Sequence, residues 1–260
     1  MKVLIGTPSH EGTVCCDYAI AMCEVFRLAK QHGHDLRLHF NMYSSLVQKS
    51  RNKIFKIAYD GDYDALIWID ADQGFKPEAF FKILEHPVDV AAIPVRLKLE
   101  EESYNIWPSD PAAHTWDDEL KLLQVKGVGT GFFKLSREAI KVLWDQGEVY
   151  HDNGNEHRMI CNVEVRGGKF IGEDHHICEL LTEAGYPIYV DIETTCDHYG
   201  PKRFRGSYVE YCYTKAKERA NDIAKNKQQT KHTDKARDGA RDKARDEELR
   251  KAFSAEGLAC

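Results

Sequence analysis

The chain lacks any apolar run long enough to cross a membrane as a helix. No part of its 260 residues approaches the roughly 18 uninterrupted apolar positions that a spanning helix needs. Residues 1–6 have the pattern of a first strand, and they are too short and wrongly flanked for a signal peptide. We therefore expect a protein without a membrane span.

The eight cysteines lack the spacing of a zinc site or of a disulfide framework. None of them forms a Cys-x-x-Cys pair, and most lie within apolar, periodic segments. Cysteines of this kind behave as small buried hydrophobic residues in a reducing compartment. The pattern therefore argues against structural zinc and against disulfides, and we expect a cytoplasmic protein.

Charge is distributed unevenly along the chain. Residues 215–251 contain 13 Lys and Arg against 8 Asp and Glu, whereas the whole chain carries a formal net charge of -6. The remainder is therefore strongly acidic. Within the basic segment, Lys-Ala-Arg-Asp at 235–238 recurs with a period of four, which produces no stable apolar stripe. We expect residues 214–260 to form a charged extension, helical or disordered, beyond a domain of residues 1–213.

Strand and helix signals alternate through residues 1–213. This alternation predicts a single α/β domain, with a mostly parallel, twisted central sheet flanked by helices. Ser45 has the spacing of a capping box for a helix that runs towards Ala58. Residues 97–121 lose the periodicity and are expected to form a loop or an insertion, and residues 146–168 are a polar, glycine-containing stretch.

Two carboxylates, Asp70 and Asp72, directly follow the apolar run 65–69. Such a run is typical of a buried parallel strand, and ligands of open α/β sheets bind at the carboxyl ends of the strands. The two carboxylates repel each other unless a cation or a donor-rich ligand lies between them, and a divalent ion that also binds phosphate oxygens would meet that need. The alternative interpretation is a polar turn after a strand.

Further polar groups follow in an order that resembles GT-A (Rossmann-like) glycosyltransferases, particularly the family-2-like enzymes of phages and bacteria. The resemblance covers about residues 1–206. Its most specific part is Gly172-Glu173-Asp174-His175-His176-Ile177-Cys178, followed by residues 185–191 and then by His198-Tyr199-Gly200. In such enzymes an acidic pair opens a helix, and a histidine completes the metal site after the next strand.

The resemblance implies a metal site and a catalytic pair. Asp70, Asp72 and His198 would form the site that holds Mn²⁺ or Mg²⁺ against the donor diphosphate, with Asp72 as the direct ligand, Asp70 facing the ribose or a metal-bound water, and His198 as a further ligand. The imidazole weakly favours Mn²⁺. By the same resemblance Asp174 would be the general base beside Glu173. The alternatives are that His198 caps a surface turn and that the acids only stabilise a helix N-terminus. Whether the reaction inverts or retains configuration stays open.

The resemblance also implies a set of residues that bind the donor. Arg51 supplies a fixed fork of donors for phosphate or base edges, although it would equally suit a solvent-facing helix position. A flap around Lys202 would cover the diphosphate, or it would be an ordinary solvated loop. The full set is Thr7, Pro8, Arg51, Asn52, Asp70, Ala71, Gly131 and Lys202.

The implied activity is metal-dependent transfer of a sugar from a nucleotide-sugar, with UDP favoured, to a hydroxyl group of a glycan, a protein or a hydroxymethylated DNA base. One alternative is a sugar-nucleotide nucleotidyltransferase, which the lack of a basic residue in the loop 6–12 disfavours. Another is a non-catalytic module that binds nucleotides or glycans. Several side chains are candidates for stacking on the acceptor, or for loop packing: Trp107, His114, Trp116, Tyr150 and His151.

Overall fold

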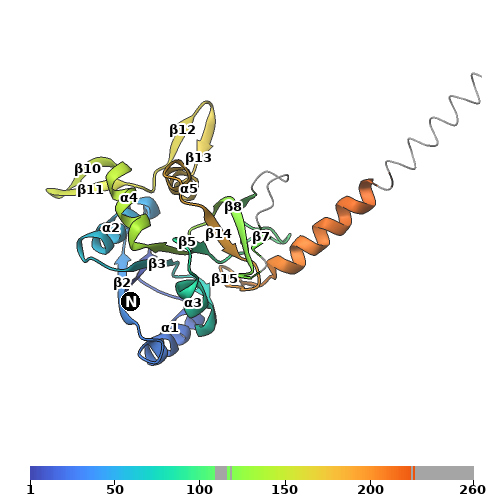
Figure 1. The fold of residues 1–260 in the computed structure, drawn as a ribbon, viewed down its shortest axis with the longest axis horizontal. Helices are drawn as coiled ribbons and strands as arrows, with labels where there is room; N and C mark the ends of the chain where they lie inside the picture. Colours follow the sequence, from blue (N-terminus) through green and yellow to red (C-terminus); the bar gives the residue numbers. More distant parts are fainter. Residues whose placement is uncertain (109–115, 118, 224, 226–260) are drawn as a thin grey trace, which may run out of the picture. The chain divides into compact units, whose positions relative to one another are not determined.

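The computed structural model describes residues 1–108, 116–117, 119–223 and 225. It divides into two units, Met1–Val209 and Glu210–Cys260. The described part of the second unit is helical as far as residue 223 (Figure 1), and the repeats expected at 235–246 lie outside the described residues. In the part of the chain that is described, no helix is long and apolar enough to cross a membrane.

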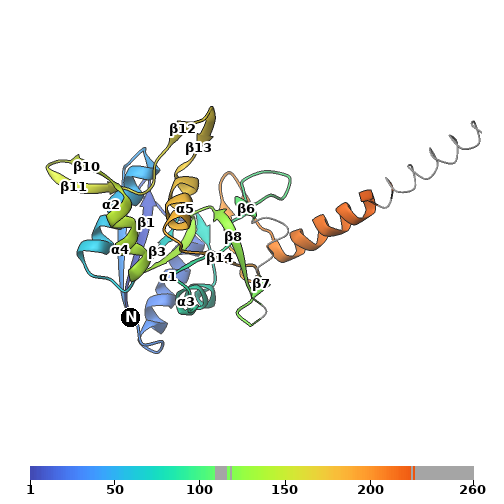
Figure 2. The ribbon, with the colours of Figure 1, turned by 45° about the horizontal axis from the view of Figure 1, so that its top comes forward.

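A sheet of nine strands forms the centre of the first unit (Figures 1 and 2). Its strand order is β2-β1-β3-β9-β5-β14-β8-β6, and β7 also pairs with β8. The strands in chain order are β1 (Lys2–Ser9), β2 (Asp35–Met42), β3 (Ala65–Ile69), β5 (Val90–Ala92), β6 (Ile106–Pro108), β7 (Trp116–Asp117), β8 (Leu122–Val128), β9 (Phe132–Ser136) and β14 (Ile188–Asp191).

The fold class is α/β with a central sheet flanked by helices, as predicted, but the strand pairing is mixed. β1 is parallel to β2 and β3, and β14 is parallel to β5, whereas the other described pairs of this sheet are antiparallel. The cause lies in β8 and β9, which run in the same direction and are joined only by residues 129–131. The chain does not reverse there, so β9 enters between β3 and β5 antiparallel to both.

Helices cover both faces of the sheet. Ile54 and Phe55 of α2, with the apolar sides of α4 and α5, pack against one face, while α1 and α3 pack against the other. β3 is buried on both sides because Leu66 and Trp68 face the first layer, whereas the alternate residues Ala65, Ile67 and Ile69 face the second. The helices are α1 (Cys16–Ala29), α2 (Val47–Asp60), α3 (Pro77–Glu85), α4 (Arg137–Gln146) and α5 (Glu173–Glu183).

Three smaller sheets fall partly in segments whose periodicity predicts no strand. Two are hairpins, with turn residues Asn153-Gly154 and Gly167-Gly168 at positive φ, as two-residue hairpin turns require. The third joins short strands that are distant in sequence. The strands are β10 (Glu148–Asp152) with β11 (Asn155–Met159), β12 (Glu164–Arg166) with β13 (Lys169–Ile171), and β4 (Gln73–Gly74) with β15 (Asp197–Tyr199) and β16 (Arg203–Phe204).

A lysine is buried within the central sheet. Lys134 of β9 is only 4% exposed, and its ammonium donates to the carbonyls of Leu84 at 3.3 Å and His86 at 2.7 Å. Burial lowers the pKa of Lys134 from 10.5 to about 8. Lys134 therefore satisfies carbonyl groups at the C-terminal end of α3. Removing its charged ammonium from water opposes folding.

We expect Lys134 to make stability depend on pH. Between about pH 8 and 10.5, the unfolded chain holds a proton on Lys134 that the folded chain has lost, so stability rises with pH across this window. Relative to Lys134→Met, the free energy of unfolding of the wild type should rise by on the order of 3 kcal/mol. Urea titrations of both proteins at several pH values measure this difference, and a constant difference would contradict the burial argument.

Candidate functional site

The carboxyl ends of β1, β2 and β3 lie beside a cavity of about 700 Å³. Because these strands are parallel, their carboxyl ends meet at one edge of the sheet, which is where open α/β sheets bind ligands. The volume is within the range of small-molecule sites. The lining residues are Pro8, Ser9, His10, Glu11, Thr13, Val14, Cys15, Ser44, Ser45, Val47, Ser50, Asp70, Ala71, Asp72, Lys98 and Gly200.

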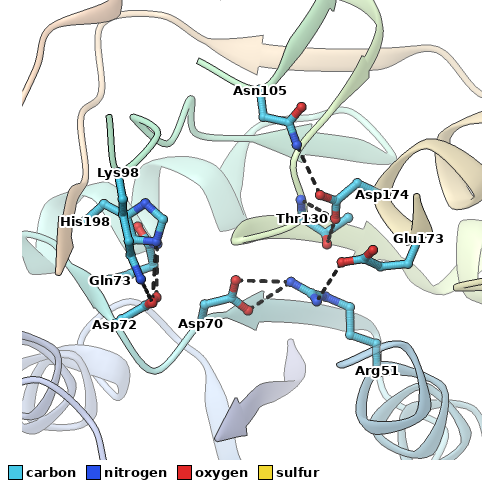
Figure 3. Close-up of polar contacts among 10 residues, drawn as sticks. All are labelled: Arg51, Asp70, Asp72, Gln73, Lys98, Asn105, Thr130, Glu173, Asp174 and His198. Carbon is cyan, nitrogen blue, oxygen red and sulfur yellow. Dashed lines mark hydrogen bonds and ion pairs between the residues drawn. The ribbon is translucent and has the colours of Figure 1, made fainter. Parts of the chain in front are cut away.

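Asp70, the first residue after β3, pairs with an arginine of α2. Arg51 Nη2 donates to both carboxylate oxygens of Asp70, at 2.9 and 3.1 Å (Figure 3). The Arg51 side chain is only 3% exposed, and its Nη1 lies 3.8 Å from the carboxylate of Glu173. Arg51 is therefore a buried cation that lies between the carboxylate of Asp70, after β3, and that of Glu173, at the start of α5.

The pKa values of the two aspartates shift in opposite directions. Burial raises the pKa of Asp70 to about 6, although the charge of Arg51 opposes the shift. Burial would also raise the pKa of Asp72, but hydrogen bonds from His198 and Lys98 outweigh it and lower the pKa to about 2. Burial alone would lower the pKa of Arg51, whereas the surrounding carboxylates raise it overall. Each carboxylate thus depends on cationic groups of its own.

Asp72 faces nitrogen atoms from three other residues (Figure 3). Its Oδ2 lies 2.5 Å from Lys98 Nζ and 3.4 Å from His198 Nε2. Its Oδ1 lies 3.4 Å from Gln73 Nε2. Because the Asp72 side chain is 38% exposed and lines the cavity, the same carboxylate can meet a ligand there.

Backbone pairing between β4 and β15 brings His198 to Asp72. His198 lies opposite Gln73 in this antiparallel pair, and the Tyr199 N–H donates to the Asp72 carbonyl at 2.8 Å. The His198 Nδ1 lies 2.8 Å from the Arg96 carbonyl. A hydrogen bond from Nδ1 to that carbonyl directs Nε2 towards Asp72, and a backbone carbonyl that orients the ring in this way is typical of metal-binding histidines.

The donor set around Asp72 fits a hydrated divalent cation. Asp72 Oδ2 and His198 Nε2 lie 3.4 Å apart, near the separation of about 3 Å between neighbouring ligands of a small octahedral ion. Gln73 Oε1 is buried and has no hydrogen-bond partner among the described residues, so a metal-bound water could donate to it. No group of three or more His, Cys, Asp or Glu side chains in the described ranges is arranged for a metal. A cation would therefore take the rest of its ligands from water or from phosphate.

The structure does not bring the predicted metal ligand Asp70 into one set with Asp72 and His198. Its carboxylate accepts both hydrogen bonds from Arg51. The reason is that α2 supplies a buried guanidinium directly beside the end of β3. Asp72 and His198 remain the pair that can share a cation.

Asp174, in the first turn of α5, is held by residues from two other segments. Its Oδ1 accepts hydrogen bonds from both the backbone N–H (3.0 Å) and the hydroxyl of Thr130. Its Oδ2 accepts a hydrogen bond from Asn105 Nδ2 at 3.2 Å (Figure 3). Within the described residues Oδ2 accepts this one bond only, so it retains the capacity to accept another proton donor.

The glycines on either side of Thr130 allow the side chains of Asp70 and Asn105 to approach the backbone. A Cβ on Gly131 would lie 3.3 Å from Asp70 Oδ2, and a Cβ on Gly129 would lie 3.2 Å from Asn105 Nδ2. The Gly131 carbonyl also accepts the Asp70 backbone N–H at 2.9 Å. The loop between β8 and β9 therefore connects the Asp70 side of the site to the Asp174 side.

The predicted donor-binding residues divide into two groups. Pro8, Asp70 and Ala71 line the cavity, and Arg51 contacts it through Asp70. Thr7, however, is fully buried, and its hydroxyl shares a 2.5 Å hydrogen bond with Tyr18. Its side chain therefore faces the α1 layer and does not line the cavity.

Asn52 and Lys202 also lie away from the cavity lining. The Asn52 amide oxygen accepts the N–H groups of Ile160 and Cys161, and its nitrogen donates to the Cys161 carbonyl and to Met159 Sδ. These four contacts use the hydrogen-bonding capacity of the amide, so Asn52 anchors the chain after β11. Lys202 pairs instead with Glu100 on the surface.

The candidate acceptor residues are scattered. The ring centroids of Trp107 and His175 lie 4.3 Å apart, and His175 follows Asp174 in α5. Tyr150 stacks on His157 within the β10–β11 hairpin, which also carries His151. His114 and the side chain of Trp116 lie outside the described residues.

Sequence reasoning missed three residues that contact the carboxylates of Asp72 and Asp174. They are Lys98, Asn105 and Thr130. The first two lie in the segment whose lack of periodicity predicts a loop or insertion, and nothing in their spacing marks them. Thr130 lies between the glycines 129 and 131, and this position is the one signal that could have indicated a residue in contact with a ligand or a carboxylate.

No protein-family model matches the sequence, and no curated protein matches it. Among solved structures, A197 from STIV is similar with a TM-score of 0.47 and 17% identity, over 80% of this chain and 91% of that one. A glycosyltransferase involved in glycosylation of the major capsid of PBCV-1 has a TM-score of 0.30 and 14% identity, over 55% of this chain and 63% of that one. GalNAc-T7, solved with UDP, GalNAc and Mn²⁺, has a TM-score of 0.42 and 9% identity, over 76% of this chain and 43% of that one.

The chain thus spans less than two thirds of the length of the last two proteins. At these identities and scores the likenesses do not establish a family or an activity for this chain. What the site can do is therefore argued from its own residues.

We expect the Arg51–Asp70 pair to be a strongly coupled structural element. Arg51→Met should lower the free energy of unfolding by about 1–3 kcal/mol, because it leaves the Asp70 carboxylate, which is 28% exposed, without its partner. In Arg51→Met/Asp70→Asn the loss should be smaller than the sum of the single losses. Urea denaturation of the four proteins measures the coupling. The exposed pair Arg37–Asp35 is the control, for which Arg37→Met should cost less than about 1 kcal/mol, and additive losses at 51 and 70 would contradict the coupling.

Proposed function

We propose that this chain is a metal-dependent glycosyltransferase of the GT-A type. It would move a sugar from a nucleotide-sugar donor, with UDP as the nucleotide, to a hydroxyl acceptor. The observation that carries the proposal is the meeting of Asp72 and His198 beside a 700 Å³ cavity at the carboxyl edge of the parallel strands. Asp174, tied to the loop between β8 and β9, supplies a separate carboxylate for proton transfer.

The cavity supports a nucleotide-sugar as its ligand. Its lining combines apolar side chains with hydroxyl groups from the segments after β1 and β2, such as those of Thr13 and Ser44, and two of its carboxylates are those of Asp70 and Asp72. In the proposal the nucleoside lies towards Pro8 and the diphosphate towards Asp72. Asp72 and His198 would hold Mn²⁺ or Mg²⁺, which when bound acts as a Lewis acid towards the leaving diphosphate.

Asp174 is the proposed general base. It would accept the proton of the acceptor hydroxyl while the acceptor oxygen forms a bond to the sugar carbon, and the bond from that carbon to the diphosphate oxygen breaks with its electron pair leaving on the nucleotide. The hydrogen bonds from Thr130 and Asn105 fix the carboxylate while Oδ2 keeps acceptor capacity. Proton transfer by a positioned carboxylate contributes about 10²–10⁴-fold to such reactions.

We expect one nucleotide to stabilise the protein only in the presence of a divalent cation. A thermal-shift panel would compare UDP, GDP and CMP and their sugars, with and without Mn²⁺, on the wild type and on Asp72→Asn. A ligand of the folded state raises Tm according to its affinity. The expected result is a shift with a uridine nucleotide that requires Mn²⁺ and is lost in Asp72→Asn. If no nucleotide gives a metal-dependent shift, the transferase proposal is wrong.

Asp174→Asn should slow turnover strongly and leave donor binding intact. With the nucleotide-sugar that the panel identifies, release of the nucleoside diphosphate should fall by about 10²–10⁴-fold, because the amide cannot accept the proton. The Mn²⁺-dependent thermal shift should be unchanged. Glu173→Gln is the matched control from the same helix turn, with a smaller expected loss. A variant Asp174→Asn that turns over at the wild-type rate would rule out the base role, whereas a wild type that binds the nucleotide-sugar and releases no nucleoside diphosphate with any acceptor would favour a binding module.

A further inference from the structure

Lys98 occupies the position at Asp72 where the proposed cation would bind. Its ammonium lies 2.5 Å from Asp72 Oδ2, the same oxygen that lies 3.4 Å from His198 Nε2. The contact is not deeply buried, because the two side chains are 35% and 38% exposed. A lysine in this position neutralises Asp72 when no other cation is bound.

The main chain around Lys98 is fixed, whereas its ammonium group can move. Arg96 donates hydrogen bonds to the carbonyls of Leu99, Glu100 and Arg205, and these bonds close the segment around Lys98. The aliphatic part of Lys98 packs against Gly200, where a Cβ would lie 3.1 Å from Lys98 Cδ. Lys98 lines the cavity, and rotation about the last bonds of its side chain can carry the charge away from Asp72.

His198 is anchored to the same segment as Lys98. The Arg96 carbonyl binds His198 Nδ1 at 2.8 Å, and Arg96 lies two positions before Lys98 in the chain. The segment therefore holds one imidazole and one competing ammonium beside a single carboxylate. A divalent ion at Asp72 and an ammonium at the same oxygen repel each other strongly at such distances.

We propose that Lys98 is an exchangeable counter-ion that makes metal binding depend on the nucleotide. In the empty site Lys98 pairs with Asp72, and when a cation and a nucleoside diphosphate are both bound Lys98 pairs with the diphosphate. The cation alone binds weakly, because it must displace Lys98 with no new anion to receive the lysine. This inference rests on the proposed function, since it requires a diphosphate in the same cavity.

The proposal predicts a measurable coupling between the two ligands. The nucleotide should raise the affinity for Mn²⁺, and by linkage Mn²⁺ should raise the affinity for the nucleotide by the same factor. Lys98→Met removes the competing charge while keeping the length of the side chain. It should therefore bind Mn²⁺ alone about 10-fold more tightly than the wild type, and its coupling to the nucleotide should shrink.

Mn²⁺ binding can be measured directly from the electron paramagnetic resonance signal of the free ion. Titrations would be carried out on the wild type, Lys98→Met and Lys98→Gln, each with and without UDP. Lys141→Met is the matched control, because Lys141 forms a single exposed ion pair with Glu138 at 2.9 Å on α4. Circular dichroism melts of all variants establish that they are folded.

Three outcomes are informative. Tighter binding of Mn²⁺ alone in both Lys98 variants, with a reduced effect of UDP and an unchanged control, is the expected result. Equal Mn²⁺ affinity in the wild type and the Lys98 variants, with UDP raising it equally, would overturn the role of Lys98 and leave the proposed function standing. Failure of every protein to bind Mn²⁺, even with UDP, would overturn both.

Discussion

Negative charge at the carboxyl end of β3 must be neutralised, and the rest of the site is arranged around this need. Asp70 receives a buried guanidinium from α2, whereas Asp72 receives an ammonium and an imidazole from segments further along the chain. Two carboxylates one residue apart therefore have separate partners. This separation makes Asp70 a structural anion and leaves Asp72 as the carboxylate whose cation can be exchanged.

The site is assembled from contacts between distant parts of the sequence. The pairing of β4 with β15 places His198 at Asp72, and the loop between β8 and β9 holds the start of α5 through Thr130 and Asp174. Arg51 adds a third connection because it lies between Asp70 and Glu173. The proposed chemistry depends on these connections more than on any single helix or strand.

Strongly periodic segments and strand ends could be predicted from the sequence. The apolar run before Asp70 is β3, and the acidic pair 173–174 does open α5. The capping prediction at Ser45 was wrong, because α2 begins at Val47 after Leu46 with no side-chain cap. Short strands such as β4 and β15 show no period from which to predict them, and their pairing is fixed only by tertiary contacts.

The direction of a polar side chain was equally hard to predict. Asn52 and Arg51 are adjacent on α2, yet Arg51 points to Asp70 whereas Asn52 binds the backbone at 160–161. The hairpin β10–β11 makes this second contact possible, and the residues of that hairpin have a composition that also suits a loop. Lys98 falls in an aperiodic segment, so its contact with Asp72 depends on the fold of that segment.

The measurement that tests the central claim most directly is anomalous diffraction at the manganese edge, from crystals grown with Mn²⁺ and UDP. The account predicts a manganese peak bonded to Asp72 and to His198 Nε2, with the diphosphate completing its coordination and Asp70 still paired with Arg51. UDP bound in the cavity with no manganese at Asp72, or manganese bound elsewhere with His198 uninvolved, would contradict it.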